Sequence, residues 1–274
     1  MSLKIHHVTR YSYEPAAIQA GLRMKLFPQA TDGQAISSWS LKVNGDDVAP
    51  LHVDGAGDAV SLWLNHAATE EIEIVAEGEV ETKDMAGVLK GLREAARPPV
   101  YRRSTEATGA NDAIRDLAAE IEGDDALERM HALSALVHKV IDYRPGVTET
   151  TTTAAEALAL GSGVCQDQTH VFLATARVMD IPARYVVGYL DDPDSDAPSD
   201  KTHAWAEAHV KGLGWVGFDV TNQLCPTELY VRLCSGLDAA DAAPIRGSVL
   251  GETEESMEVE IAVERIAGQS QTQQ

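Results

Sequence analysis

Hydrophobic and polar residues alternate over residues 1–85, which is the period of a β-strand with one buried face. In the segment 3–14, one face carries Leu3, Ile5, His7 and Thr9. The same alternation returns in three later segments, 38–47, 58–65 and 71–81. Short alternating strands broken by Gly, Asp and Pro predict an N-terminal antiparallel β-sandwich-like domain.

The alternation stops at residues 86–105, where we expect a linker. A short helical pattern at 85–96 has to end before Pro98-Pro99, because proline lacks the backbone N–H and restricts the residue before it. We therefore place the domain boundary in this stretch.

The period becomes helical after the linker. Segments 111–123 and 124–143 carry apolar residues three and four positions apart. In the next segment, Thr153 is followed by Glu156 three positions later and by Gly161 at the end. This is the signature of a capping box and a glycine stop. A further helix begins near Cys165.

Strands follow the helices. The segments with a strand pattern are the run from Arg184, 203–210, 214–220 and an alternating stretch near the C-terminus. Helices followed by strands predict an α+β domain with an antiparallel sheet, which we place at 106–266. The acidic stretch 191–200 is expected to be a solvated loop and 267–274 a frayed tail.

Charge and cysteine content narrow the partners and the compartment. The chain has 22 Lys and Arg against 43 Asp and Glu, a formal net charge of -21. This balance argues against nucleic-acid and anionic-membrane partners. No apolar run approaches the roughly 20 residues that span a bilayer, and the start lacks the apolar segment of a secretory leader. The three cysteines, an odd number, indicate a reducing compartment, so we expect a cytoplasmic protein.

Cys165 stands where a Gly-Ser-Gly bend turns into a helix. A helix N-terminus favours a thiolate, and its backbone N–H groups can stabilise an oxyanion. A thiolate that attacks an acyl carbon also needs an imidazole to exchange protons and a carboxylate to orient that imidazole. A histidine and a carboxylate are therefore expected close to Cys165.

His203 and Asp219 lie on two consecutive predicted strands. If the turn pairs His209 with Leu213, His203 lies directly opposite Asp219, with the Cβ atoms roughly 5 Å apart. Placement on one face requires an odd-length loop or a bulge, because an even loop splits the pair across the sheet. We expect Asp219 to accept a hydrogen bond from Nδ1 of His203, which leaves Nε2 for the thiol.

Two other interpretations of the same residues stay open. Cys165 would serve as a small buried hydrophobic residue in any core. A zinc site is the second, because Cys165, His203, His209 and Asp219 are all metal-ligand types. The chain lacks the usual metal-binding spacings, so no metal and no other cofactor is expected.

Several neighbouring residues are interpreted as structural. Asp167 is placed to cap backbone donors at the helix start. His170 lies about 140° around the helix from Cys165 and is not expected to act as the base. Glu207 is expected to pair with an arginine such as Arg184. The remaining cysteines, Cys225 and Cys234, lack nearby bases.

Three segments carry these residues: GSGVCQDQTHVFLATARVMDIPARYVVGYL, THAWAEAHV and GWVGFDVTN. Together they resemble the bacterial transglutaminase-like family of cysteine enzymes, and the resemblance is dense from Tyr143 to Asn222. The stretches HHVTRYSYE and APIRGSVLG resemble the N-terminal domain that accompanies this core in many bacterial members.

This resemblance implies a papain-like core in which a Cys-bearing helix packs on an antiparallel sheet. It assigns Cys165 as nucleophile, His203 as base and acid, and Asp219 as the residue that orients the imidazole. The expected activity is thiol acyl transfer on an amide of a peptide or protein, most simply as a peptidase or amidohydrolase. Transfer to a primary amine uses the same acyl-enzyme, so water and amine are not separated here.

Two alternative functions stay open. One is an acyltransferase that takes its acyl group from a thioester with the same triad. The other is a non-catalytic protein-binding module that keeps the core for its shape. The residues carry no indication of the oligomeric state.

Overall fold

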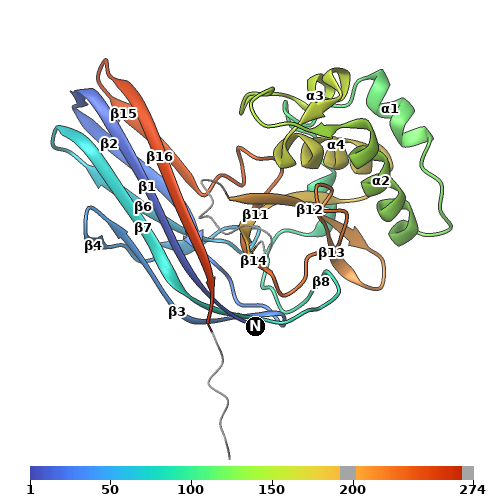
Figure 1. The fold of residues 1–274 in the computed structure, drawn as a ribbon, viewed down its shortest axis with the longest axis horizontal. Helices are drawn as coiled ribbons and strands as arrows, with labels where there is room; N and C mark the ends of the chain where they lie inside the picture. The colour runs from blue at the N-terminus through green and yellow to red at the C-terminus, as the bar shows by residue number, and fades with distance from the viewer. Residues whose placement is uncertain (192–201, 267–274) are drawn as a thin grey trace, which may run out of the picture.

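The computed structural model describes residues 1–191 and 202–266. In it, a strand-rich part and a part that contains all the helices lie side by side (Figure 1). The expected acidic loop and C-terminal tail fall almost entirely outside the described residues. None of the helices in the described ranges is long and apolar enough to cross a membrane.

Two antiparallel sheets form the strand-rich part. The five-stranded sheet has the order β16-β1-β7-β3-β4, and the four-stranded sheet has the order β15-β2-β6-β5. Their bounds are β1 Ser2–Ala17, β2 Gln19–Phe27, β3 Gln34–Val43, β4 Asp46–Asp47, β5 His52–Val53, β6 Ala59–Asn65, β7 Thr69–Thr82, β15 Ile245–Leu250 and β16 Glu254–Arg265. The predicted N-terminal sandwich is thus present, and it is completed by two strands from the other end of the chain.

The C-terminal strand lies in a different sheet from the one we expected. β16 pairs with β1 in an antiparallel register that joins Leu3 to Arg265 and Tyr11 to Met257, and β15 pairs with β2. It therefore extends the N-terminal sheet, although it was expected to belong to the unit at 106–266. β1 pairs with β7 along its other edge, so β16 is the edge strand of this sheet.

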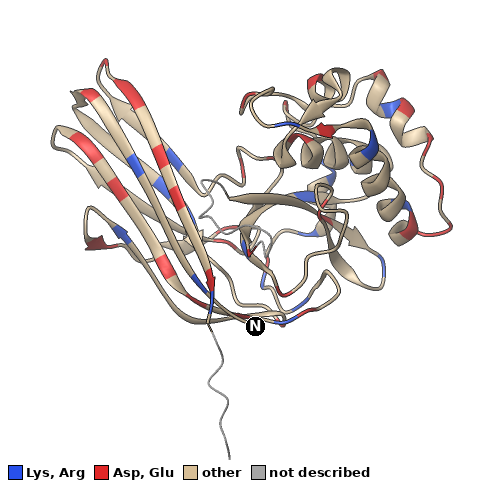
Figure 2. Cartoon of the chain, viewed as in Figure 1, with Lys and Arg blue, Asp and Glu red and all other residues tan. Residues whose placement is uncertain are grey.

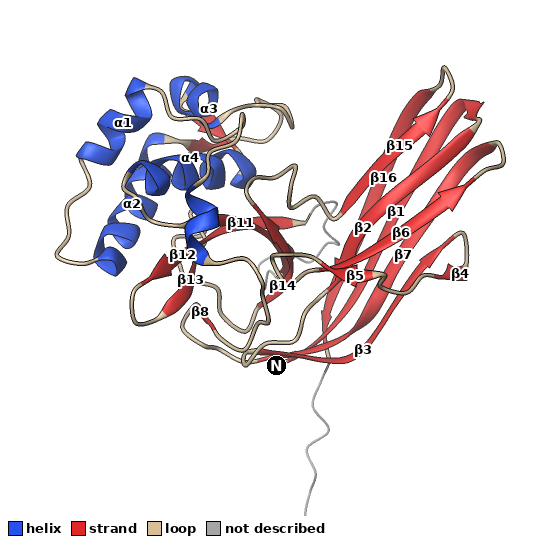
Figure 3. Cartoon of the chain, turned by 180° about the vertical axis from the view of Figure 1, so that it is seen from behind, coloured by secondary structure: helices blue, strands red, loops and turns tan. Residues whose placement is uncertain are grey.

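The second part contains the helices and a five-stranded antiparallel sheet of order β14-β11-β12-β13-β8 (Figure 3). The helices are η1 Pro98–Arg102, α1 Asp112–Ala119, α2 Ala126–Val140, α3 Ala154–Leu160 and α4 Cys165–Val178. The strands are β8 Val88–Leu89, β9 Asp142–Tyr143, β10 Ser162–Gly163, β11 Ala183–Leu190, β12 His203–Val210, β13 Gly214–Phe218 and β14 Tyr230–Gly236. The α+β class and the antiparallel core sheet are confirmed.

The stretch expected as a linker is partly ordered on the core. No helix forms at residues 85–96; instead β8 adds to the edge of β13. Glu94 in the same stretch accepts a hydrogen bond from Trp215 Nε1 at 2.7 Å and pairs with Arg184. These contacts replace the expected helix because the charged side chain finds buried partners on the sheet.

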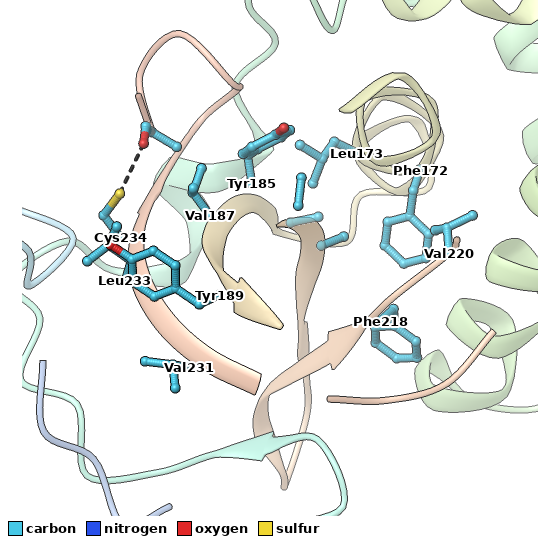
Figure 4. Close-up of a cluster of buried hydrophobic side chains, with 14 of the residues drawn as sticks. Phe172, Leu173, Tyr185, Val187, Tyr189, Phe218, Val220, Val231, Leu233 and Cys234 are labelled. Atoms are coloured by element: carbon cyan, nitrogen blue, oxygen red, sulfur yellow. Dashed lines mark hydrogen bonds between the residues drawn. The ribbon is translucent and has the colours of Figure 1, made fainter. Parts of the chain in front are cut away.

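α4 packs against β11 and β12, and its apolar face forms the centre of the core (Figure 4). Phe172 on α4 and Phe218 on β13 stack with their ring centroids 5.5 Å apart. Cys234 on β14 is fully buried, and its thiol donates to Ala242 O at 3.0 Å. Burial raises the pKa of the Cys234 thiol well above its ordinary value, which fits a structural cysteine.

A buried group of charges joins the two parts. Nζ of Lys25, on β2, lies 2.7 Å from Asp54 Oδ2 and 3.3 Å from Asp58 Oδ2. The same amine donates to the backbone oxygen of Ser235 on β14 at 3.1 Å, and Ser235 N donates to Asp58 Oδ2 at 2.8 Å. Burial alone would lower the pKa of Lys25, but the two aspartates outweigh it and raise the pKa, so the ammonium form is retained.

Candidate active site

Cys165 is the first residue of α4, and Asp167 makes the helix begin there. The Asp167 carboxylate accepts the backbone N–H of Val164, the N-cap, at 2.8 Å, and it accepts the Thr148 hydroxyl at 2.7 Å. A Cβ on Gly163 would lie 2.6 Å from Asp167 Oδ2, so glycine is needed for this close approach. The capping role predicted for Asp167 is confirmed.

The bend before Cys165 is built as the sequence predicts. Thr153 and Glu156 form the capping box of α3, and Gly161 ends that helix in the left-handed conformation with φ 68°. The chain then forms β10, which pairs in parallel with β9. The two-residue strand thus anchors the backbone just before the helix that carries the thiol.

His203, the first residue of β12, lies next to Asp219, just after β13. Nε2 of His203 is 2.6 Å from Asp219 Oδ2, and the two side chains are 15% and 0% exposed. Our expectation for the ring nitrogens is wrong: Nε2, and not Nδ1, bonds the carboxylate, which leaves Nδ1 for the thiol.

The β12–β13 hairpin has a register two residues away from the one assumed. His209 pairs with Trp215 and not with Leu213, across a three-residue loop at 211–213. His203 and Asp219 are therefore diagonal neighbours and not directly opposed residues. The loop is odd, so both side chains still lie on one face, and long side chains bridge a diagonal separation.

Asp219 is held by more groups than the sequence suggested. Tyr230 Oη and Asn222 Nδ2 each donate to Asp219 Oδ2 at 2.7 Å, and Asn222 N donates to Oδ1 at 3.1 Å. Burial alone would raise the pKa of Asp219, but these donors together with His203 outweigh it and lower the pKa. Asn222 had a local signal, since an Asp followed three residues later by Asn is typical of a side-chain-capped turn. Tyr230 comes from a distant strand and had none.

His203 interacts with both expected partners. Burial would lower the pKa of its imidazole, but the hydrogen bond to Asp219 and the neighbouring Cys165 raise the pKa to about 10. The ring therefore carries a positive charge at neutral pH. The structure thus places the His203 imidazole against Asp219, and the Cys165 sulfur is close enough to influence the pKa of the ring.

A groove of about 920 Å³ opens over Cys165. One wall is formed by the core near Val164 and Tyr185, and the other by residues 7–11 of β1 and 257–260 of β16. The sequence did not indicate that the N-terminal sheet lines this groove, because the wall depends on pairing between the two ends of the chain.

The remaining candidates are structural. His170 is buried, and its Nε2 accepts the backbone N–H of Ala239 at 3.0 Å, so its ring is occupied away from Cys165. Glu207 pairs with Arg184 as expected, with Nε 2.7 Å from Oε2, and Arg232 Nε donates to its other oxygen at 2.9 Å. Burial raises the pKa of Cys225. Trp205 and Trp215, the latter stacked under Arg184, are buried in the core.

Over residues 1–191 and 202–266, no three His, Cys, Asp or Glu side chains are grouped so that they could hold a metal ion. His209, the remaining member of the zinc interpretation, packs edge-on against Trp215 with ring centroids 5.3 Å apart.

Comparison with known proteins finds similarity over both parts of the chain. Residues 115–220 match the profile of the Transglutaminase-like superfamily, and residues 3–81 match that of the Bacterial transglutaminase-like N-terminal region. An uncharacterised protein of Mycobacterium tuberculosis is 32% identical over 290 residues, covering 95% of this chain and 91% of the relative. One of Mycobacterium leprae is 27% identical over 285 residues, covering 97% and 99%.

Among solved structures, the chain is similar to a Cytophaga hutchinsonii protein described as a "Putative Cysteine Protease". The TM-score is 0.75 at 23% sequence identity, and the match covers 98% of this chain and 92% of that chain. The two proteins therefore share the arrangement of both parts.

Proposed function

Because the chain belongs to the bacterial transglutaminase-like family, we propose that it cleaves an amide bond of a peptide or protein through a thioester at Cys165. In this proposal His203 acts as general acid and general base, and Asp219 orients its imidazole ring. The observation that carries this proposal is the position of His203, which bonds Asp219 through Nε2 and has a pKa that is raised in part by Cys165, the first residue of α4. The description of the Cytophaga hutchinsonii protein points to the same chemistry.

In the first half of the reaction, the Cys165 thiolate attacks the amide carbon and forms a C–S bond. The developing oxyanion lies at the N-terminus of α4, where the backbone N–H of Cys165 can donate to it. The imidazolium then passes its Nδ1 proton to the amide nitrogen. The C–N bond breaks, the amine leaves, and the acyl group stays on sulfur as a thioester.

In the second half, neutral His203 takes a proton from a water molecule that attacks the thioester. The C–S bond breaks, the acid leaves, and the thiolate–imidazolium pair is restored. Asp219 keeps the ring in one orientation throughout, since its carboxylate is itself held by Tyr230 and Asn222. A primary amine in place of water gives a new amide by the same steps.

The substrate class and compartment belong to the same proposal. The groove of about 920 Å³ over Cys165 suits a peptide segment, which supports a peptide or protein substrate. The three cysteines are free thiols, which supports the cytoplasm. The division into an N-terminal domain at 1–85 and a catalytic domain from 106 also stays a proposal, with the C-terminal strands assigned to the former.

A peptide library tests the proposal. The protein is incubated with the library, with and without a primary amine, and the products are followed by mass. Hydrolysis, deamidation and cross-linking give distinct mass changes, and a thioester trapped on the Cys165 peptide identifies the nucleophile. The Cys165→Ala variant is expected to lose every product, whereas the Cys225→Ala variant is expected to keep them. Undiminished products from Cys165→Ala would overturn the proposal, as would silence of a correctly folded wild-type protein, which would favour the binding module.

A further inference from the structure

β16 presents an open edge to the groove that contains Cys165. It is the first strand of its sheet, with β1 on one side and no strand of the described residues on the other. In Figure 1 it is the strand of this sheet that lies towards the helical part. Residues 257–260 line the groove together with Cys165. An edge strand beside a candidate nucleophile is a template for an extended chain.

The register of β16 tells which of its backbone groups are available. Ile266 N donates to Ser2 O, so residues 2 and 266 form a hydrogen-bonded pair. Hydrogen-bonded pairs alternate along an antiparallel ladder, so even-numbered residues of β16 bond to β1. The N–H and C=O groups of Met257 and Val259 consequently point to the open edge.

The side chains of the same residues make the groove wall apolar. Met257 is opposite Tyr11 and Val259 is opposite Thr9, and these side chains share the face that lines the groove. Met257 is 57% exposed, so its apolar surface is available to an added strand. An added strand would cover it with every second side chain, and apolar residues are favoured at those positions.

Acidic residues alternate with apolar ones along β16 (Figure 2), and neighbouring side chains of a strand point to opposite faces. Glu258 and Glu260 alternate with Met257 and Val259, and they make no ion pair with the described residues. The nearby cation, Arg10, is bonded through Nε to Glu73 Oε2 at 2.9 Å. Arg10 lies opposite Glu258, whereas Glu260 lies opposite Val8. An added strand would therefore place its outward side chains beside two carboxylates that form no ion pair within the described residues, and opposite charges on neighbouring strands attract.

We propose that the substrate of the proposed amide cleavage binds as an extra β-strand on the open edge of β16. The recognised segment alternates apolar side chains, which face Met257 and Val259, with basic side chains, which face Glu258 and Glu260. The edge backbone fixes the peptide in an extended form, and the alternation fixes its register. The inference rests on the proposed function for the chemistry at Cys165, but not for the binding itself.

Binding is measured in the Cys165→Ala variant by fluorescence anisotropy, so that no turnover occurs. The probes are a hexapeptide that alternates Lys and Leu, one that alternates Glu and Leu, and one with three Lys followed by three Leu. The alternating basic peptide is expected to bind about tenfold more tightly than either of the others, since opposite charges on neighbouring strands attract and like charges repel. Combining Glu258→Lys with Glu260→Lys should reverse the order of the two alternating peptides. Glu264→Lys, on the same face of β16 but outside the groove, should leave the order of affinity of the two peptides unchanged.

The backbone contact is tested with proline. Val259→Pro removes an edge N–H inside the groove and is expected to weaken binding about tenfold, while Val263→Pro removes the equivalent N–H outside the groove and should have little effect. N-methylation of the probe gives the same test without changing the protein. Methylation of one alternate set of its amides should weaken binding, and methylation of the other set should not.

Equal affinity for the acidic and basic alternating peptides, or equal loss from both methylated sets, would overturn the inference. These outcomes can be told apart from failure of the proposed function. If wild-type protein cleaves amides without preferring the alternating peptide, only the inference fails. If the alternating peptide binds as described and Cys165 forms no acyl-enzyme, only the proposed chemistry fails.

Discussion

At the scale of single residues, Asp219 controls the charge of the imidazole. It is fully buried, and its bond to Nε2 is the first of the interactions that raise the pKa of His203 to about 10. Asp219→Asn keeps the size of the side chain and removes the negative charge. We expect the pKa of His203 to fall towards its ordinary value, and kcat for amide cleavage to fall roughly 10⁴-fold. The pKa is followed by NMR titration of the ring.

Tyr230→Phe gives a graded control for that change, because it removes one donor to the Asp219 carboxylate and leaves the aromatic ring. Loss of one such hydrogen bond corresponds to roughly tenfold in kcat, with the His203 pKa still raised. If Tyr230→Phe lowered kcat as much as Asp219→Asn does, the hydroxyl would have a role beyond holding the carboxylate.

At the scale of elements, the first turn of α4 depends on a space that only glycine leaves. A Cβ at position 163 would push the Asp167 carboxylate off Val164 N, which frees the helix start and displaces the thiol. Gly163→Ala is expected to lower the free energy of unfolding by about 1–3 kcal/mol and to slow labelling of Cys165 by iodoacetamide. Urea denaturation and mass spectrometry measure the two effects.

Gly109→Ala is the matched control for this substitution. A Cβ there would meet its nearest neighbours at 3.7 Å, which is ordinary contact. The change in unfolding free energy is expected to stay within about 0.5 kcal/mol, with unchanged labelling of Cys165. Equal effects from the two alanines would show that the approach of Asp167 to residue 163 does not determine the helix start.

Local patterns predicted most elements, and contacts distant in the sequence produced the errors. Alternation found β1, β3, β6 and β7, and the capping box found α3, because each signal lies within one element. His203 and Asp219 shared a face because a short hairpin joins their strands. The direct opposition of His203 and Asp219 was wrong because the hairpin register depends on packing against other strands, and the ring nitrogen that bonds Asp219 had no signal in the sequence. The partner of β16 and the groove wall were missed because they join opposite ends of the chain.

At the scale of the whole molecule, the two parts are held together by buried charges. Replacement of Lys25 by Met leaves the carboxylates of Asp54 and Asp58 without the ammonium that they share. We expect a loss of about 3–5 kcal/mol in the free energy of unfolding, because among the described residues Asp54 and Asp58 then keep only the cations of Arg23 and Arg232, at 3.7 and 3.6 Å, and breaking a buried ion pair is costly. Urea denaturation measures the loss, and adding Asp58→Asn to the variant should recover part of it.

The exposed pair of Arg115 and Asp112 supplies the comparison for Lys25. Its side chains are 57% and 97% exposed, with Arg115 Nε 3.4 Å from Asp112 Oδ1. Arg115→Met is expected to change the unfolding free energy by less than about 1 kcal/mol, because water screens the pair. If Lys25→Met changed the unfolding free energy as little as Arg115→Met does, the buried group of charges would not be what joins the two parts.

The dependence of stability on pH is also a property of the whole molecule. Folding lowers the pKa of some histidines and raises that of another, so their contributions to stability change with pH in opposite directions. Burial lowers the pKa of both His7 and His170 to about 4. Between pH 6.5 and 4 the unfolded chain binds more protons at these rings than the folded chain does, so the folded state loses stability as the pH falls. His203, with its pKa raised to about 10, binds more protons in the folded chain between pH 6.5 and 10. Its contribution is complete below pH 6.5 and is lost as the pH rises to 10.

The thermal midpoint is therefore expected to be highest near pH 6.5 and to decline on both sides. The two declines can be separated by substitution, because they come from different residues. His7→Gln should flatten the decline between pH 6.5 and 4, because the depressed pKa is worth about 3 kcal/mol for one ring. His203→Gln should flatten only the decline between pH 6.5 and 10, and the exposed His52→Gln should change neither. Calorimetry across this range measures the profile. A midpoint that rose steadily from pH 6.5 to 10 in the wild-type protein would mean that His203 is not held as a cation by Asp219 and Cys165.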